Sequence, residues 1–347
     1  MKTCIYLSYK GLGANLLHLT YCHEIAKTYG PVTILTLCNN LESALKDDPL
    51  IEKIILIDKF HKRFIDILKL KKFLNTFNFD QIFIYYPSFR IYLASIFSNI
   101  KKVYSYPIFN KKNLHLVKAA KRFTEKSLGI SNCPTETVFF IKKAKIDEIN
   151  KNFDNKKFKI IIGAGSSGPS TKWVTKNFYK LINRLNDSGN YHFFILCGPD
   201  DKALSDEIIN NVNKNNCLPM YDKKIEEVIP YLCSANMYVG NDSFGSHIAS
   251  QSGIKSLVML LDSPKAYTDY SKNYQRIIPD GIKIEDLNHG SNLKPEDISV
   301  EKVYQKIVNN RFSTMVFKTS SFASLTIADN LAVSGDTSGW IFFWILM

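Results

Sequence analysis

Residues 4–37 read CIYLSYKGLGANLLHLTYCHEIAKTYGPVTILTL, and this stretch decides the fold. A short apolar run at 4–8 precedes a glycine-bearing turn, and a helical pattern through Ala26 leads to a second apolar run at 32–37. Strands that are apolar along their whole length and separated by a helix are typical of parallel strands covered on both faces. The stretch therefore predicts a strand–helix–strand unit of an α/β protein.

The same alternation continues along most of the chain. Further apolar runs predict strands at 53–57, 81–86, 102–106, 159–165, 192–198, 217–220, 237–242 and 256–261. Helical patterns lie between them, at about 63–75, 89–98, 113–128, 175–187, 201–213, 223–234 and 246–252. Two such series predict two doubly wound parallel sheets that face a cleft, with ligands at the carboxyl ends of the strands.

Composition shifts suggest the domain boundaries. Residues 141–157 are polar and charged without a strand period, which favours a linker between a Rossmann-like domain at 1–150 and another at 151–312. A length of 347 residues suits two domains. Residues 313–347 are atypical, because no Lys or Arg follows Lys318 and the end is apolar. They are either a foreign tail or an extra strand packed on the domain, and the apolar run is too short to span a membrane.

The positive charge lies in the first half of the chain. Apolar residues make up 45% and charged residues 22%, as in ordinary globular proteins. Residues 1–150 carry 23 Lys and Arg against 12 Asp and Glu, whereas residues 151–347 carry 22 against 20. This excess favours an anionic partner, which could be a nucleic acid, a phosphorylated glycolipid or an acidic membrane surface.

The cysteines argue for a reducing compartment and against a metal site. All seven are scattered singly, with no CxxC motif and no His at metal-ligand spacing. The first residues contain no secretory signal, and no stretch reaches the 18 or more apolar residues of a membrane span. We expect a cytoplasmic protein, with peripheral contact at the inner face of the cytoplasmic membrane as an option.

Three glycine-bearing turns follow predicted strands, and the first is KGLGAN at residues 10–15. A dinucleotide-binding fingerprint would need a third glycine where Leu16 stands, and an acidic residue at the end of the next strand. Neither is present. The turn is therefore either a site of close approach between backbone and ligand or a tight strand-to-helix turn without a ligand.

The second turn, GAGSSGPSTKWVTKNF at 163–178, has the features of a phosphate site. Small residues let backbone amides approach a phosphate, the next helix begins there, and Lys172 adds a full positive charge. The spacing of a Walker loop is absent, and a flexible loop without a ligand is the alternative. Trp173 is expected to pack in the core rather than to stack on a base.

The third turn, VGNDSFGSHIAS at 239–250, joins a predicted strand to a helix. Asp242 and Ser243 stand where a ligand could meet the carboxyl end of the strand, although either would also serve as a helix cap. His247 lies about one turn into the helix and can face either the cleft or the core.

Together the three turns resemble those of the heptosyltransferases of glycosyltransferase family 9, which extend the inner core of lipopolysaccharide. Family members have a first turn ending in Gly-Asp, a middle loop of the form PGA...GPxKRWP, and a late motif GNDTGxxHxAAAxGxP. The corresponding stretches here are GLGAN, GAGSSGPSTKWV and GNDSFGSHIASQSGIK, within a resemblance that covers about residues 1–310. It implies the GT-B arrangement of two Rossmann-like domains, in which the second binds an ADP-sugar and the first binds the acceptor. Transfer inverts the anomeric centre without a metal.

The resemblance also implies roles for individual residues, with departures. The family's Asp at the first turn looks placed as the general base, and the best alignment puts Asn15 there, whose amide cannot accept a proton at neutral pH. His18 is the nearest titratable substitute, unless it is a buried structural histidine. Thr171 and Lys172 stand where the family has Lys and Arg, and Phe244 replaces a Gly.

The expected function is inverting transfer of a sugar from a nucleotide sugar, with an ADP-sugar as donor substrate, an anionic glycolipid as acceptor, and no other cofactor, metal or nucleic acid. The residues expected on the donor side are Gly165, Ser166, Thr171, Lys172, Asp242, Ser243, Phe244, Gly245 and His247. Those expected on the acceptor side are Lys10, Gly11 and Gly13. One alternative is a relative that binds glycan or nucleotide sugar without transferring it. A nucleic-acid binder is a further alternative, though the chain has no recognised DNA- or RNA-binding module.

Overall fold

The computed structural model describes residues 1–57, 66–86, 88–106, 116–154, 156–166, 172–261, 270–287 and 293–311. The chain forms two compact units, Met1–Val300 and Glu301–Met347. In the second unit residues 301–311 are helical, and the atypical tail at 313–347 lies outside the described residues. Both sheets, and the pocket described below, belong to the first unit.

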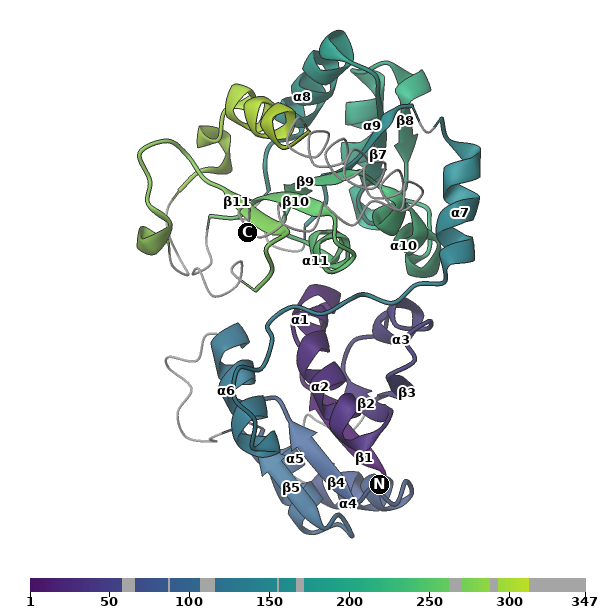
Figure 1. The fold of residues 1–347 in the computed structure, drawn as a ribbon, viewed down its shortest axis with the longest axis vertical. Coiled ribbons are helices and arrows are strands. Elements are labelled where there is room, and N and C mark those ends of the chain that lie inside the picture. Colours follow the sequence, from purple (N-terminus) through teal and green to yellow (C-terminus); the bar gives the residue numbers. More distant parts are fainter. Residues whose placement is uncertain are drawn as a thin grey trace, which may run out of the picture. The chain divides into compact units, whose positions relative to one another are not determined.

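The first sheet has five strands in the order β3-β2-β1-β4-β5, and every neighbouring pair is parallel (Figure 1). Its strands are β1 (Thr3–Leu7), β2 (Val32–Thr36), β3 (Ile51–Leu56), β4 (Gln81–Ile84) and β5 (Lys102–Ser105). The helices of this half are α1 (Leu12–Leu16), α2 (Leu19–Tyr29), α3 (Leu41–Ala44), α4 (Asp66–Asn75), α5 (Phe89–Ile96) and α6 (Leu116–Leu128).

The second sheet has six strands in the order β11-β10-β9-β6-β7-β8, again all parallel. Its strands are β6 (Phe158–Gly163), β7 (Tyr191–Leu196), β8 (Cys217–Pro219), β9 (Met237–Asn241), β10 (Lys255–Met259) and β11 (Tyr274–Ile277). The helices of this half are α7 (Lys143–Asn152), α8 (Thr175–Ser188), α9 (Lys202–Asn210), α10 (Ile225–Ser234) and α11 (Phe244–Gln251). The predicted α/β fold with two parallel, Rossmann-like sheets is confirmed.

The first predicted helix is in fact two helices. The chain leaves α1 through a tight turn in which the His18 N–H donates to Asn15 O, and α2 then begins at Leu19. The His18 side chain caps this break from inside, since its Nδ1 lies 2.8 Å from Ala14 O. The break gives α1 a direction of its own at the carboxyl end of β1.

The polar segment predicted to be a linker contains helix α7. An ion pair between Lys143 and Asp147, four residues apart, supports the helix, and the Ile149 side chain is buried. The sequence shows little helical period here, because Ile149 is the only buried residue of α7. The strand β11 was also missed, as was the short helix α3.

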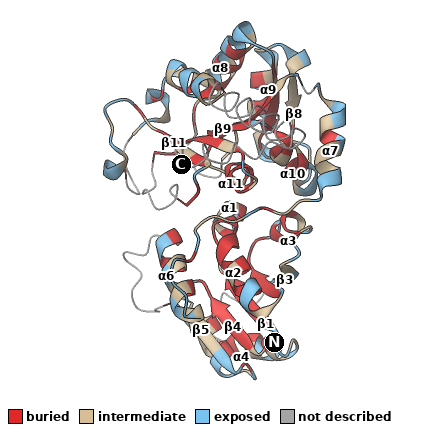
Figure 2. Cartoon of the chain, viewed as in Figure 1, coloured by how far each residue is buried: buried red, intermediate tan, exposed pale blue. Residues whose placement is uncertain are grey.

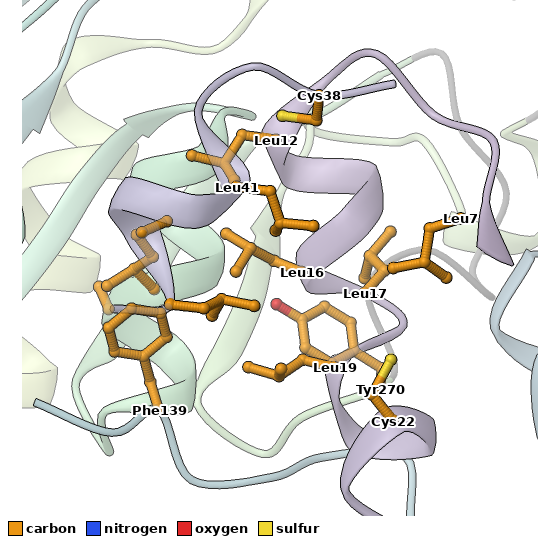
Figure 3. Close-up of a cluster of buried hydrophobic side chains, with 14 of the residues drawn as sticks. Leu7, Leu12, Leu16, Leu17, Leu19, Cys22, Cys38, Leu41, Phe139 and Tyr270 are labelled. Carbon is orange, nitrogen blue, oxygen red and sulfur yellow. The ribbon is translucent and has the colours of Figure 1, made fainter. Parts of the chain in front are cut away.

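A continuous apolar core joins the two halves where α1 meets α11 (Figure 2). The cluster includes Leu16 and Leu17 of α1 together with Phe139 and Tyr270 from later in the chain (Figure 3). A buried hydrogen bond crosses the same junction, from Gln251 Nε2 to Leu16 O at 2.9 Å. Helices α1 and α11 are thereby held against each other.

Candidate functional site

A pocket of about 700 Å³ opens at the carboxyl ends of strands from both sheets. From the first half it is lined by Lys10, Gly11, Leu12, Gly13, Ala14, Leu17 and Asn40. From the second half it is lined by Gly165, Ser166, Lys172, Leu196, Cys197, Gly198, Asp200, Asp201, Asp242, Ser243, Phe244 and His247. This is the place at which doubly wound sheets bind ligands.

Gly13 allows the first turn to approach the third. A β-carbon on Gly13 would lie 3.0 Å from His247 Cδ2 and 3.3 Å from His247 Nε2, closer than side chains normally pack. No atom lies within 4 Å of the corresponding position on Gly11. Of the two glycines, Gly13 is therefore the one that the contact between α1 and α11 requires.

Asn15 lies inside the protein rather than in the lining of the pocket. Its side chain is 1% exposed, and Nδ2 donates to Tyr9 O at 2.9 Å and to Gly11 O at 2.8 Å. Its Oδ1 accepts a hydrogen bond from Thr36 Oγ1 at 3.0 Å. The amide thus fastens the turn to β2, and both of its polar atoms are engaged.

His18 is likewise buried. It is 0% exposed, its Nδ1 is bonded to Ala14 O, and its ring stacks on Tyr9 with centroids 4.9 Å apart. Burial lowers the pKa of His18 to about 4, so the ring is neutral at pH 7. The residues of α1 and its C-cap that do line the pocket are Leu12, Gly13, Ala14 and Leu17, and none of them can titrate.

The third turn presents Asp242 to the pocket. Its Oδ1 accepts from Tyr274 OH at 2.5 Å and from Ser246 Oγ at 3.5 Å, and lies 3.4 Å from His247 Nε2. The other ring nitrogen of His247 lies 2.7 Å from Tyr270 OH. Burial lowers the pKa of His247, while the charge of Asp242 opposes that shift. The result is a carboxylate oriented by three neighbours.

Ser243 caps helix α11, as one of the two sequence interpretations predicts. Its side chain accepts from the Gly245 N–H at 3.3 Å, and Ser246 Oγ accepts in turn from the Ser243 N–H at 3.3 Å. Ser243 and Phe244 also line the pocket. Gly245 does not line it: a β-carbon there would lie 2.4 Å from Leu196 Cδ2, so this glycine is needed for packing against β7.

Asn241 joins the second and third turns, and the sequence analysis did not single it out. Its side chain is buried, with Nδ2 donating to Ala164 O and Oδ1 accepting from the Trp173 N–H, each at 2.7 Å. The Trp173 indole donates to Ile298 O at 2.9 Å and packs edge-on against Phe178. The prediction that Trp173 belongs to the core is confirmed.

The pocket wall also holds charged residues from β7 onward that were missed. Asp200 and Asp201 line it directly after the strand, and Asp201 Oδ1 lies 3.5 Å from Lys172 Nζ. Their sequence, GPDD after the run 192–198, could have been found by the rule that ligands meet strand carboxyl ends. Gly165 and Ser166 line the pocket as expected, and Thr171 lies outside the described residues.

The acidic and histidine side chains do not gather into a metal site. Within the described ranges, no group of three or more His, Cys, Asp or Glu side chains is placed to hold a metal ion. In the same ranges no helix is long and apolar enough to cross a membrane.

Comparison with known proteins places this geometry in context. Residues 98–278, more than half of the chain, match the model of glycosyltransferase family 9 (heptosyltransferase). Among curated protein sequences none matches the chain.

Several solved structures share the fold. The glycosyl transferase family 9 protein of Veillonella parvula is 15% identical, with a TM-score of 0.68 over 88% of this chain and 95% of that one. E. coli ADP-heptose lps heptosyltransferase II is 14% identical, with a TM-score of 0.66 over 90% of this chain and all of that one. E. coli heptosyltransferase WaaC with ADP is 15% identical, with a TM-score of 0.64 over 89% of this chain and all of that one. At these identities the likeness is one of fold, and that fold is the GT-B-like pair of Rossmann-like sheets.

Proposed function

The chain belongs to glycosyltransferase family 9, and from that premise we propose that it is an inverting, metal-independent transferase acting on a lipopolysaccharide core or related envelope glycan. The proposed donor is a nucleotide sugar, with ADP-heptose as the first candidate. Two structures with the same fold contain ADP or ADP-2-deoxy-2-fluoro heptose, which supports an ADP-sugar.

The observation that carries the proposal is the mixed charge of the 700 Å³ pocket. A diphosphate needs positive charge and backbone N–H donors, and Lys10, Lys172 and the start of α11 supply these along the pocket. Hydroxyl groups of a sugar or ribose need acceptors, which Asp200, Asp201 and Asp242 provide. Both chemistries occur in one cavity of the size that nucleotide-sized ligands fill.

In this proposal the second half binds the donor. Lys172, Ser243 and the backbone near Gly165 hold the diphosphate and stabilise it as it leaves, which is the part of the reaction where negative charge develops. Asp242 lies beside the sugar. Gly245, which was expected among the donor contacts, contributes by letting α11 pack closely on β7. The domain division at residues 150 and 151 belongs to the same proposal.

The first half would receive an anionic glycolipid, at the inner face of the cytoplasmic membrane. Its excess of Lys and Arg favours such an acceptor. Helix α5 and its C-cap also expose the apolar side chains of Phe89, Ile96 and Phe97, and the exposed Lys101 and Lys102 stand four and five residues beyond Phe97. Apolar side chains beside lysines are typical of proteins that rest on anionic membranes.

A sedimentation assay tests this contact. We expect the full chain to sediment with vesicles that contain anionic lipid and to be released by salt, because salt screens the lysines. The double variant Phe89→Ser with Phe97→Ser should bind more weakly. Equal binding of this variant, or equal binding to neutral vesicles, would argue against membrane contact through α5.

A thermal-shift panel tests the donor. The full chain is heated with ADP-, GDP-, UDP- and dTDP-sugars, and a ligand at 100 times its Kd should stabilise the folded state by about 2.7 kcal/mol. We expect the ADP-sugars to raise the Tm most. A panel in which no compound raises the Tm would contradict the donor assignment.

A second candidate is a relative that binds the nucleotide sugar without transferring it. The observation that favours it is the face of α1, where Gly13, Ala14 and Leu17 line the pocket and Asn15 is buried. Turnover separates the candidates: a binder gives a Tm shift with an ADP-sugar but releases no ADP from it, with or without an acceptor glycan.

A further inference from the structure

The face of α1 that borders the pocket offers no proton acceptor. The residues that line the pocket from this helix and its C-cap, Leu12, Gly13, Ala14 and Leu17, carry no titratable side chain. If the chain transfers a sugar as proposed, the attacking hydroxyl must lose its proton to some group. A positioned base contributes about 10²–10⁴ to such a rate. The inference below rests on the proposed function and concerns where that group is.

Position 14 is the one at which α1 could have supplied a base. The family's Asp directly follows a Gly, so counted from Gly13 it corresponds to Ala14 and not to Asn15, the position that the first alignment favours. Successive residues of an α-helix point about 100° apart, so Ala14 can border the pocket while Asn15 is buried against β2. Ala14 thus leaves a methyl group where the wall could have held a carboxylate.

Seven titratable residues line the described pocket, and most of them are unsuitable. Burial raises the pKa of the Cys197 thiol to about 11, so it is a weak proton acceptor. Lys10 and Lys172 are cations at neutral pH. Asp201 is paired with Lys172 at 3.5 Å, and Asp200 is exposed to solvent. His247 is 4% exposed, with Nδ1 engaged by Tyr270 OH and Nε2 directed at Asp242.

Asp242 is the remaining candidate, and its two oxygens differ. The contacts given above from Tyr274, Ser246 and His247 all fall on Oδ1. Among the described residues none is bonded to Oδ2, and the side chain is 31% exposed where it lines the pocket. A carboxylate held through one oxygen with the other open to the cavity is oriented to accept a proton.

The same carboxylate lies next to the start of α1. His247 Nε2 is 3.4 Å from Asp242 Oδ1 and 3.3 Å from the position that a β-carbon on Gly13 would take. One imidazole ring therefore separates Asp242 from the turn to which the acceptor side is assigned. The open oxygen faces a cavity shared by donor and acceptor residues.

We propose that Asp242 is the proton acceptor of glycosyl transfer in this chain, and that the role has moved from α1 to the start of α11. Oδ2 takes the proton of the acceptor hydroxyl while the hydroxyl oxygen forms a bond to the anomeric carbon. The bond between that carbon and the diphosphate oxygen breaks, and its electron pair leaves with the nucleotide. Tyr274 and His247 are positioning residues, because they act only by holding Oδ1.

The tyrosines packed against Asp242 do not titrate in its place. Tyr274 on β11, Tyr238 on β9 and Tyr270 have pKa values raised by burial. Burial lowers the pKa of His247 on α11. Across the pocket lie Lys10, Lys172, Asp200 and Asp201, and the last two are also carboxylates. A change in the acid limb of the kcat profile is therefore assigned to Asp242 only when mutation of Asp242 itself causes it.

The experiment measures ADP released from ADP-heptose by the full chain, with water as the acceptor when no glycan is supplied. Asp242→Asn should lower kcat by about 10²–10⁴ and abolish the acid limb of the pH profile, while ADP still raises the Tm. Tyr274→Phe keeps the carboxylate, so it should lower kcat less and retain the acid limb. Asp206→Asn, an exposed carboxylate on α9, is the matched control and should leave kcat unchanged.

Rescue distinguishes a proton acceptor from a structural residue. Adding Ala14→Asp to Asp242→Asn should raise kcat at least tenfold above that of Asp242→Asn alone and bring back an acid limb. Adding Ala14→Asn instead should do neither. An Asp242→Asn variant that raises only KM, or keeps the acid limb, would overturn the inference and leave the proposed function standing. Failure of every nucleotide sugar to raise the Tm of the unmutated chain would instead remove the proposed function itself.

Discussion

The turn before α1 and the turn before α11 have the same backbone plan, but their polar side chains differ in exposure to the pocket. Each follows a central parallel strand, contains glycines and starts a helix at the pocket. In the first, Asn15 and His18 turn inward, and apart from Lys10 only small or apolar side chains line the ligand space. In the second, Asp242, Ser243 and His247 line that space. The direction in which a polar residue points thus depends on helix phase, which a motif alone does not specify.

The largest expected effect is on stability, and it compares a glycine of the third turn, Gly240, with one of the first, Gly11. A β-carbon on Gly240 would lie 2.4 Å from Gly163 O and 2.5 Å from its Cα, so neighbouring strands would have to separate. We expect Gly240→Ala to destabilise the fold by more than about 4 kcal/mol, or to prevent folding. Gly11→Ala, which meets no atom within 4 Å, should change the free energy of unfolding by less than about 1 kcal/mol. Urea titration measures both, and similar values would contradict the packing argument.

The next effect tests whether Asn15 is structural. Asn15→Asp places a carboxylate against two carbonyl oxygens, Tyr9 O and Gly11 O, to which Nδ2 now donates. We expect a loss of about 3 kcal/mol at pH 7. Burial raises the pKa of a carboxyl group, so the loss should shrink as pH falls from 7 toward the range in which an exposed Asp ionises.

The activity of Asn15→Asp tests the alternative that residue 15 is the position of the base. If residue 15 served as the base position, this variant would release ADP from ADP-heptose faster than the unmutated chain. We expect no gain. Ala14→Asp is the matched change at the residue that faces the pocket.

The third effect is the pH dependence of the free energy of unfolding that results from burial of His18. Burial lowers its pKa to about 4, whereas the unfolded chain binds a proton near the usual value of 6.5. The folded state therefore loses stability as pH falls from about 6.5 to 4, by about 3 kcal/mol for this group. His18→Gln should remove that slope in urea titrations at several pH values. An unchanged slope would mean that His18 is accessible to protons in the folded state.

The smallest effect concerns the cap of the second turn. Ser243→Ala removes the acceptor for the Gly245 N–H and should cost about 1 kcal/mol of stability. Ser243→Asn keeps a capping acceptor and should cost less. If Ser243→Ala also weakens the Tm shift caused by ADP beyond this stability change, the residue contacts the ligand as well as capping the helix.

The sequence predicted the parallel sheets well because their strands are apolar along their length, as in 32–37 and 159–165. It failed at α7, whose short apolar face is diluted by lysines, and at β11. The residue types of the pocket were also predictable, and Gly165, Lys172, Asp242 and His247 line it as expected. The burial of Asn15 was not, since it depends on Thr36, a partner 21 residues away on the next strand. Gly245 was misjudged because its close neighbour, Leu196, is distant in sequence.

Asn241 has a consequence for the order in which the protein forms. Its amide joins residues 77 and 68 positions earlier in the chain, Ala164 and Trp173. Such long-range contacts are slow to close and come late in folding. During synthesis, which runs from the N-terminus, the loop after β6 leaves the ribosome well before the residue that fixes it. A nascent chain that ends before residue 241 therefore lacks the anchor of this loop.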